Sequence, residues 1–294
     1  MHYMAMIYSL TQRIRDFGEL VKFSHTIFLF PFALSAVVLA NQVSPVTIGI
    51  LFWMVAALVA ARSAAMIMNR IADQNLDALN PRTAGRPLVT GRVSLGLAWL
   101  WLALACGLFV LASAMLNPLA LMLSPLALAW VLGYSFTKRF TALCHLWLGT
   151  ATALAPVGAW IAVTGAWDWR AAVLAGAVAL WVAGFDVIYA CQDINFDRDQ
   201  ALHSLPARLG LKRALWASRI MHLGALIGFF ALQPLFGLGA IYLAGAGLVT
   251  VILIAEQVLV AYKRANIPMA FFTLNGVVSV LFFFILLTDQ LAGA

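Results

Sequence analysis

Nine apolar runs, each close to the roughly 20 residues that cross the hydrocarbon core of a bilayer, occupy most of this 294-residue sequence. Hydrophobic residues make up 64% of the chain and charged residues only 10%, which leaves short polar connections and no soluble domain. The pattern predicts an all-α fold, a multi-pass transmembrane bundle of about nine helices forming a single domain over residues 1–294. The predicted spans are Phe23–Ala40, Val46–Met68, Ser94–Leu116, Leu119–Tyr134, Leu143–Val163, Ala171–Cys191, Leu215–Leu232, Leu238–Val260 and Met269–Thr288.

The distribution of basic residues predicts the orientation of this bundle. Lys and Arg gather before the first span and after the second, fourth, sixth and eighth spans, whereas the opposite connections hold little besides Arg170. By the positive-inside rule, the N-terminus and the basic connections are cytoplasmic, as in a bacterial-type inner (plasma) membrane. The net charge of +7 forms no continuous basic face, so we expect membrane lipid and not nucleic acid as a partner. No feature indicates an obligate protein partner.

Two acidic stretches stand out in a chain otherwise nearly free of charge. Asn69, Asp73 and Asp77 follow the second span at positions i, i+4 and i+8, which places them on one face of a helix. Asp193 and Asp197 follow the sixth span with the same spacing of four. Asp73 and Asp193 start their stretches 120 positions apart (193 − 73), which indicates a weak internal repeat. Since both stretches face the same side, we expect one site assembled from both halves.

The residue types in these stretches indicate a particular chemistry. Carboxylates that converge on one mouth repel one another and stay ionised only with cations between them. Mg2+ prefers oxygen ligands and is commonly shared between carboxylates and substrate phosphates, so the pattern suits a diphosphate held through magnesium. Arg and Lys in the following loops would bind the remaining phosphate oxygens. An apolar chamber beneath, rich in Phe and Trp, would hold a hydrocarbon tail and shelter a carbocation.

Four further residues are candidates for a substrate cavity. Asp186 lies seven positions before Asp193 and therefore deeper in the sixth span, with Tyr189 between them. An acid at that depth is expected to line a cavity or to be paired. Lys22 and His25 begin the first span, where either could meet an acidic aromatic substrate.

The three motifs together resemble the UbiA superfamily of intramembrane prenyltransferases. They are N-x-x-x-D-x-x-x-D after the second span, D-x-x-x-D after the sixth, and Y-x-x-x-K, read here as Tyr134 and Lys138. The surrounding D-V-I-Y-A-C-Q-D and N-P-R-T-A-G-R-P-L are similar to the 4-hydroxybenzoate polyprenyltransferase branch. The resemblance runs from V-K-F-S-H-T-I-F-L-F-P-F onward and covers essentially the whole chain.

The resemblance implies helices around a central cavity and magnesium-dependent transfer of an isoprenoid chain from a polyprenyl diphosphate to a small aromatic acid. It assigns the metal and catalytic roles by motif match. The metal ligands are Asn69, Asp73, Asp77, Asp193 and Asp197, of which the four aspartates are also the catalytic residues. The motif match also places Asn69, Tyr134 and Lys138 at the diphosphate, and in the mechanism that we expect, Arg86, Arg139 and Arg208 assist in binding it. The mechanism we expect is ionisation to an allylic cation, which then attacks an electron-rich ring carbon.

One position departs from the family pattern. Many members read N-D at the start of the first motif, where this chain has Asn69-Arg70. One potential carboxylate is missing, although the core spacing of the motif is kept. The departure is compatible with a subgroup that prenylates a dihydroxynaphthoate in menaquinone synthesis.

Two other classes of protein fit part of the pattern. A transporter could carry ions on its carboxylates, but the acids cluster at the ends of two helices and not at mid-membrane. A lipid-phosphate phosphotransferase would also use carboxylates and magnesium. Product chemistry separates them, because only a prenyltransferase releases pyrophosphate and leaves a carbon–carbon bond.

Overall fold

The computed structural model describes residues 15–21, 28–262, 267 and 270–293, and within them every regular element is helical. Among the residues in these ranges, eight helices are long and apolar enough to cross a membrane. The predicted class, an all-α multi-pass bundle, is therefore confirmed. The elements are α2 (Phe30–Ala40), α3 (Ile48–Ala72), α4 (Gln74–Leu79), α5 (Leu95–Leu116), α6 (Pro118–Thr137), α7 (Cys144–Thr164), α8 (Trp169–Ala190), η2 (Cys191–Asp193), α9 (Ile194–Asp199), α10 (Leu205–Leu209), α11 (Leu211–Phe236), α12 (Ala240–Tyr262), η4 (Ala270–Leu274) and α14 (Asn275–Gly293).

The first predicted span, Phe23–Ala40, is only partly visible. Its described part is α2, an 11-residue helix too short to cross a bilayer by itself. The N-terminal residues of the span lie outside the described ranges, as do Lys22 and His25.

The predicted division between the third and fourth spans is correct. Asn117 separates α5 from α6, and its side-chain oxygen accepts a hydrogen bond from the backbone N–H of Ala120 at 2.9 Å. This N-cap satisfies one of the donors that the first helical turn leaves free. The Asn117 amide also donates to the carbonyl of Ile161 at 2.8 Å, which ties the α5–α6 turn to α7.

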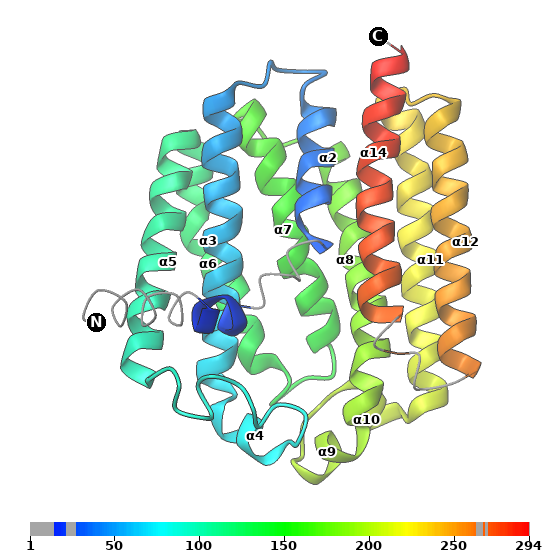
Figure 1. Cartoon of the computed structure of the whole chain (residues 1–294). Helices are drawn as coiled ribbons and strands as arrows, with labels where there is room; N and C mark the ends of the chain where they lie inside the picture. The colour runs from blue at the N-terminus through cyan, green and yellow to red at the C-terminus, as the bar shows by residue number, and fades with distance from the viewer. Residues whose placement is uncertain (1–14, 22–27, 263–266, 268–269, 294) are drawn as a thin grey trace, which may run out of the picture.

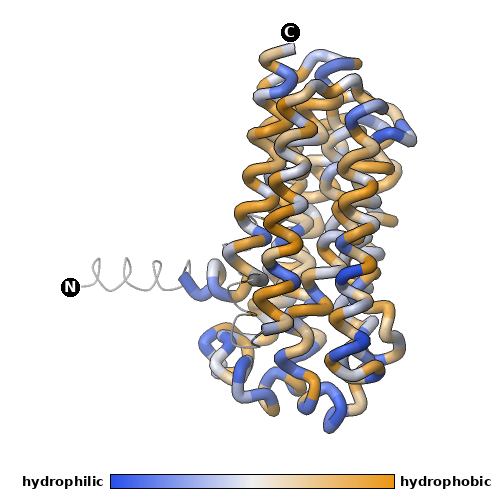
Figure 2. Tube along the Cα trace, turned by 90° about the vertical axis from the view of Figure 1, so that its right-hand side faces the viewer, coloured by the Kyte–Doolittle hydropathy of each residue, from blue (hydrophilic) through white to orange (hydrophobic). Residues whose placement is uncertain are grey.

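Both acidic stretches lie at the same end of the bundle. In Figure 1, α3 and α8 run toward the end where α4, α9 and α10 gather, opposite the C-terminus. Figure 2 shows hydrophilic residues concentrated at that end and hydrophobic residues along the length of the helices. The parallel placement predicted from the internal repeat is therefore present, and one site can draw on both halves.

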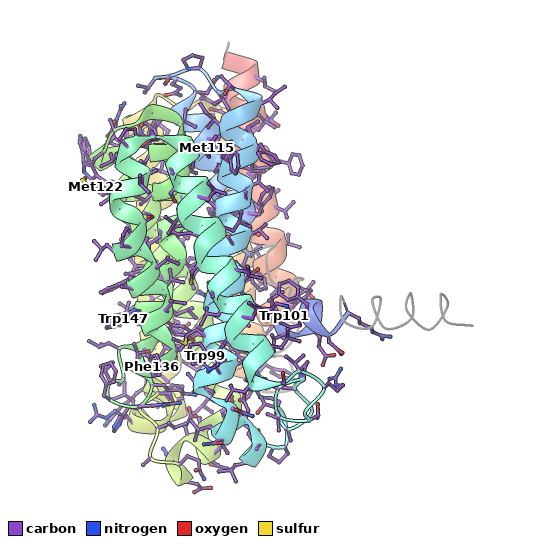
Figure 3. All side chains as sticks on the ribbon, turned by 90° about the vertical axis from the view of Figure 1, so that its left-hand side faces the viewer. Trp99, Trp101, Met115, Met122, Phe136 and Trp147 are labelled. Atoms are coloured by element: carbon purple, nitrogen blue, oxygen red, sulfur yellow. The ribbon has the colours of Figure 1, made fainter. Side chains whose placement is uncertain are left out.

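Aromatic residues divide between an internal core and the outer surface. Phe32, Trp181, Phe229 and Phe282 are each at most 2% exposed and pack together where α2, α8, α11 and α14 meet. Other large apolar side chains face outward, as expected where lipid replaces water. In Figure 3, four labelled aromatic residues lie on the side of the bundle nearer the α4–α9 end, an arrangement typical of a membrane interface: Trp99, Trp101, Phe136 and Trp147.

The α7–α8 contact is unusually close. Gly149 of α7 lies so near the Ala179 carbonyl of α8 that a Cβ at this position would fall far inside van der Waals distance of that oxygen. Small residues allow this approach, and it brings the ends of α7 and α8 close enough for their side chains to bond. The contact therefore helps to position the walls of the cavity described below.

Candidate functional site

A cavity of about 770 Å³ lies inside the bundle. Its walls come from α2, α3, α5, α6, α7 and α8, and residues of α4, α9 and their loops surround its hydrophilic end. At the other end it reaches Leu116 and Ala120, at the turn between α5 and α6. The cavity therefore extends from the acidic stretches into the apolar interior, and we call its hydrophilic end the mouth.

Each of the four predicted catalytic aspartates lines this cavity and is paired with one basic side chain. The pairs, which we call the mouth pairs, are Asp73–Arg139, Asp77–Arg86, Asp193–Arg82 and Asp197–Lys138. Three of them join different segments of the chain, so they hold these segments together around the mouth and also neutralise its charges. The expectation that the acids need cations between them is met here by protein side chains.

The first acidic stretch does not lie on one uninterrupted helix. The regular helix α3 ends at Ala72, Asp73 adopts a turn conformation, and the short α4 begins at Gln74. That part of the prediction is wrong, because the helix is broken at its charged residue. The hydrogen-bond ladder nonetheless continues, from Asp73 N to Asn69 O at 3.0 Å and from Asp77 N to Asp73 O at 2.7 Å. All three side chains consequently still line the cavity.

Asn69 links Asp73 to the residue that departs from the family pattern. Its amide donates to the Asp73 carboxylate at 3.0 Å, and its oxygen accepts from Arg70 at 3.1 Å. Arg139 binds the other oxygen of Asp73 at 3.1 Å. Burial, reinforced by the neighbouring Asp77 carboxylate, raises the pKa of Asp73, so an added cation would be favoured beside it. As arranged, Asn69 orients Asp73; its role as a metal ligand stays a prediction.

Arg82 connects the two halves of the site. It binds both oxygens of Asp193, at 3.1 and 2.5 Å, and donates to the Tyr189 hydroxyl at 2.7 Å. Asn80 donates to the same carboxylate at 3.4 Å. A bidentate guanidinium–carboxylate contact is both strong and directional. The loop after the first acidic stretch is thus fastened to the acid of the second.

Asp197 is fully buried and is held from two sides. Lys138 lies 2.8 Å from one carboxylate oxygen, and Ser204 donates to the other at 2.6 Å. Ser204 is also the N-cap of α10, since its oxygen accepts from Ala207 N at 3.2 Å. Burial alone would lower the pKa of Lys138, but the Asp197 carboxylate outweighs it and raises that pKa above its usual value. The lysine is therefore fully charged at neutral pH.

Asp186 lies deeper and is paired with a histidine. His145 Nδ1 is 2.7 Å from the Asp186 carboxylate, and both residues line the cavity. The backbone N–H of Leu205 points at His145 Nε2 from 3.3 Å, so that nitrogen must accept. The proton consequently sits on Nδ1 and is donated to Asp186. From the sequence, Asp186 is expected either to line a cavity or to be paired. In the structure it does both.

The walls below the mouth are mainly aliphatic, with few aromatic side chains. Among the described lining residues, the aromatic ones are Phe109, Tyr134, Tyr189 and Phe196. The expectation of a chamber rich in Phe and Trp is wrong, because those side chains fill the internal core or face outward. Two of the four aromatic lining residues are tyrosines, one from α6 and one from α8.

Most of the predicted site residues meet at this cavity. Besides the four aspartates, its lining includes Asn69, Arg86, Tyr134, Lys138, Arg139, Asp186 and Tyr189. Arg208 is the exception among the described ones: it is exposed on α10 and does not line the cavity. Arg208 follows the second acidic stretch as Arg86 follows the first, but α10 places it at the surface.

Sequence reasoning missed several residues that the structure places in the site. Arg82 and Asn80 belong to the quoted N-P-R-T-A-G-R segment, so the motif itself could have indicated them. His145 and Ser204 could not be found in this way, because their partners are distant in the sequence. Arg62, within the second predicted span, also lines the cavity.

The donor atoms at the mouth suit a hard divalent cation. They are carboxylate oxygens, with an asparagine amide beside them, and no described group of three His, Cys, Asp or Glu side chains is close enough to hold a metal by itself. Mg2+ is commonly bound by only one or two carboxylates together with phosphate oxygens and water. The residues present therefore fit Mg2+ if a substrate supplies further oxygens.

Known proteins share both the sequence and the fold of this chain. The model of the UbiA prenyltransferase family matches residues 28–287. A 4-hydroxybenzoate octaprenyltransferase of Nitrosospira multiformis is 33% identical over 252 residues, covering 81% of this chain and 82% of the relative. The apo structure of a UbiA homolog from Aeropyrum pernix K1 is 38% identical, with a TM-score of 0.79 over 92% of this chain and 98% of that one. A UbiA homolog from Archaeoglobus fulgidus, bound to GPP and Mg2+, has the same fold at 18% identity, with a TM-score of 0.75 over 94% of this chain and 99% of that one.

Proposed function

Because this chain belongs to the UbiA prenyltransferase family, we propose that it transfers a polyprenyl chain from a polyprenyl diphosphate to a hydroxylated aromatic acid of the 4-hydroxybenzoate type. One observation carries the proposal: the four mouth pairs stand at the entrance of a cavity whose deeper walls are apolar. Such a site separates a charged head from a hydrocarbon tail, as a prenyl diphosphate requires. The relatives named 4-hydroxybenzoate octaprenyltransferase support the choice of acceptor.

The mouth pairs supply both kinds of group that a magnesium–diphosphate complex needs. Asp73, Asp77, Asp193 and Asp197 would hold Mg2+, which when bound stabilises the negative charge of the leaving diphosphate. The four cations that now neutralise the acids would turn to phosphate oxygens: Arg82, Arg86, Lys138 and Arg139. Each can donate charge-assisted hydrogen bonds without a large movement, because the acids and the phosphates share one mouth. The Archaeoglobus homolog of the same fold is bound to GPP and Mg2+, which supports a prenyl diphosphate and magnesium as the ligands.

The residues of the cavity then determine how the reaction proceeds. The bond between the first prenyl carbon and the diphosphate oxygen breaks, and its electron pair leaves with the diphosphate. Tyr134 and Tyr189 present the aromatic faces that can stabilise the resulting allylic cation. A ring carbon beside the phenol hydroxyl forms the new bond, and its proton passes to the released diphosphate or to a carboxylate. The aliphatic walls exclude the water that would otherwise capture the cation.

The orientation that we propose for the protein in the membrane rests on the residues at the mouth end of the bundle. We place the mouth at the cytoplasmic face, where soluble diphosphates and magnesium are found, because the basic connections lie at that end of the bundle. The aromatic side chains around that end would lie at the headgroup level.

Chelation of divalent metal is expected to abolish product formation. Purified protein in detergent would be incubated with a polyprenyl diphosphate, Mg2+ and 4-hydroxybenzoate, with and without EDTA, and the product measured by mass spectrometry. We expect a prenylated acid and free pyrophosphate that both disappear with EDTA and return with excess Mg2+. A parallel reaction with a dihydroxynaphthoate tests the menaquinone alternative. Folded protein that forms no carbon–carbon bond with either acceptor would contradict the proposal and favour a transporter or a phosphotransferase.

Arg82→Ala is expected to raise the KM for the prenyl diphosphate about 10- to 100-fold, the effect of losing a hydrogen bond to a charged group. The matched control is Arg208→Ala, since Arg208 also follows an acidic stretch but does not line the cavity. Steady-state kinetics at saturating acceptor would compare the two variants. Equal effects of both substitutions would show that general positive charge, and not the mouth pairs, binds the diphosphate.

A further inference from the structure

The connection between α4 and α5 carries two of the four cations of the mouth pairs. We call this connection, residues 80–94, the mouth loop; it consists of turns and bends and holds no helix. Arg82 and Arg86 reach from it to the acids, and Gly85 between them also lines the cavity. A loop is held less firmly than a helix, so side-chain contacts to it largely decide where its two arginines lie.

Arg92 binds the mouth loop to the start of the described chain without lining the cavity itself. Its two Nη atoms bind both carboxylate oxygens of Glu19 at 2.9 Å, and Nη1 also lies 3.0 Å from the Asp16 carboxylate. Nη2 donates a second bond to the carbonyl of Gly85 at 3.1 Å. Arg92 therefore joins the two halves of the loop to each other and to the helical residues 15–21, which we call the N-terminal segment.

The N-terminal segment is itself packed against the bundle. Leu20 and Val21 are only 0% and 3% exposed and pack with buried side chains of α3, α5 and the mouth loop. The Phe17 ring meets the Trp101 ring of α5 edge-on, with 5.0 Å between their centroids. Figure 1 shows the segment beside α3, toward the end where α4 lies. The segment is therefore a support to which the mouth loop can be fixed.

The contacts of Arg92 are separate from the mouth pairs. In the structure, Arg82 and Arg86 are bonded to acids of the mouth, which holds the loop from the cavity side. In the proposed function both arginines turn to phosphate oxygens, so these two bonds within the protein are given up. The bonds of Arg92 involve none of the mouth acids and stay in place throughout.

We propose that Arg92 is a positioning residue for the reaction: it keeps the mouth loop against the N-terminal segment, so that Arg82 and Arg86 stay within reach of the diphosphate. The inference rests on the proposed function, in which these two arginines bind the diphosphate. An isolated ion pair whose arginine is 37% exposed would contribute little. Arg92 differs, because its guanidinium binds two carboxylates and a carbonyl together, and its contact with Glu19 is bidentate.

The kinetic test separates binding of the diphosphate from the other steps. For Arg92→Met we expect the KM for the prenyl diphosphate to rise about five- to tenfold, while kcat and the KM for the aromatic acid change less than about twofold. Arg92→Lys keeps the charge without the fork and should recover part of the loss. The matched control is Arg170→Met, because Arg170 pairs closely with Asp168 at the opposite end of α8. A lower kcat with an unchanged KM, or the same change of KM in both Met variants, would overturn the inference.

Glu19 provides a second test, because it contacts Arg92 and also lines the cavity. Glu19→Gln would be combined with Arg92→Met in a double-mutant cycle. If Arg92 acts through its contact with Glu19, the double variant should have the same KM for the prenyl diphosphate as Arg92→Met alone. Fully additive changes would mean that the two residues act independently on the diphosphate, which contradicts a positioning role.

Hydrogen exchange of the full-length protein in detergent separates this inference from the proposed function. Backbone hydrogen bonds within the mouth loop, such as Thr90 N to Arg86 O at 3.0 Å, give its amides measurable protection. With Mg2+ and inorganic pyrophosphate as the probe, Arg92→Met should exchange faster than wild type over residues 80–94 and equally over α8. Faster loop exchange in a protein that forms no prenylated product would retain the role of Arg92 and reject prenyl transfer. Unchanged loop exchange would reject the role of Arg92 whatever the product.

Discussion

Asp197→Asn is expected to lower prenyl transfer at least about 1,000-fold, the effect of removing a preorganised electrostatic group from an active site. The substitution keeps the shape of the side chain and its capacity to accept from Ser204, but it removes the negative charge opposite Lys138. Without that charge, the mouth loses one of the four carboxylates proposed to hold the metal. Turnover would be measured at saturating Mg2+ and both substrates.

The matched control is Asp199→Asn, two residues further along α9. Asp199 is exposed and lies outside the cavity lining, so its loss should leave turnover within about twofold of wild type. Both variants should elute from size exclusion as folded protein. If Asp197→Asn kept near-normal turnover, the assignment of the mouth pairs to catalysis would be wrong.

Gly149→Ala is expected to destabilise the protein by about 1–3 kcal/mol, as overpacking of a tight contact does. The added Cβ would collide with the Ala179 carbonyl, and backbone atoms cannot turn aside as a flexible side chain can. Helices α7 and α8 would have to separate, so the distance between His145 and Asp186 should also increase. Thermal unfolding in detergent should show a melting temperature lower by about 5 °C.

Gly176→Ala on α8 provides the comparison. A Cβ at that position has no neighbour within 4 Å, and alanine is the better helix former, so the variant should be as stable as wild type or slightly more stable. Similar melting temperatures for Gly149→Ala and Gly176→Ala would show that α7 and α8 are not held at their closest distance. Activity lost in parallel with stability in Gly149→Ala would link this contact to the site.

The acidic stretches show what sequence alone can predict. The spacing of Asp73, Asp77, Asp193 and Asp197 at the ends of two apolar runs placed all four at one mouth, because helix geometry and a common membrane side constrain them strongly. The break at Asp73 was not predictable from spacing. A charged residue there can end the regular helix while its hydrogen-bond ladder continues.

The partners of the acids depend on tertiary packing and were therefore out of reach. Arg82 meets Asp193 across 111 positions, and His145 meets Asp186 across 41. Nothing in the local sequence distinguishes Arg82, which enters the site, from Arg208, which stays on the surface. The distribution of Phe and Trp was misjudged for a similar reason. Composition counts aromatic residues but does not say whether they face the core, the lipid or the cavity.

The mouth pairs have a consequence for the whole catalytic cycle. Because the four acids and four bases cancel one another before substrate arrives, the protein needs no external counterions to keep this end of the cavity neutral. Mg2+ and a diphosphate largely cancel each other as well, so they can enter and leave as a complex with little change in total charge. An enzyme working at the edge of a low-dielectric membrane thereby exchanges partners among its ions and avoids the cost of building up charge.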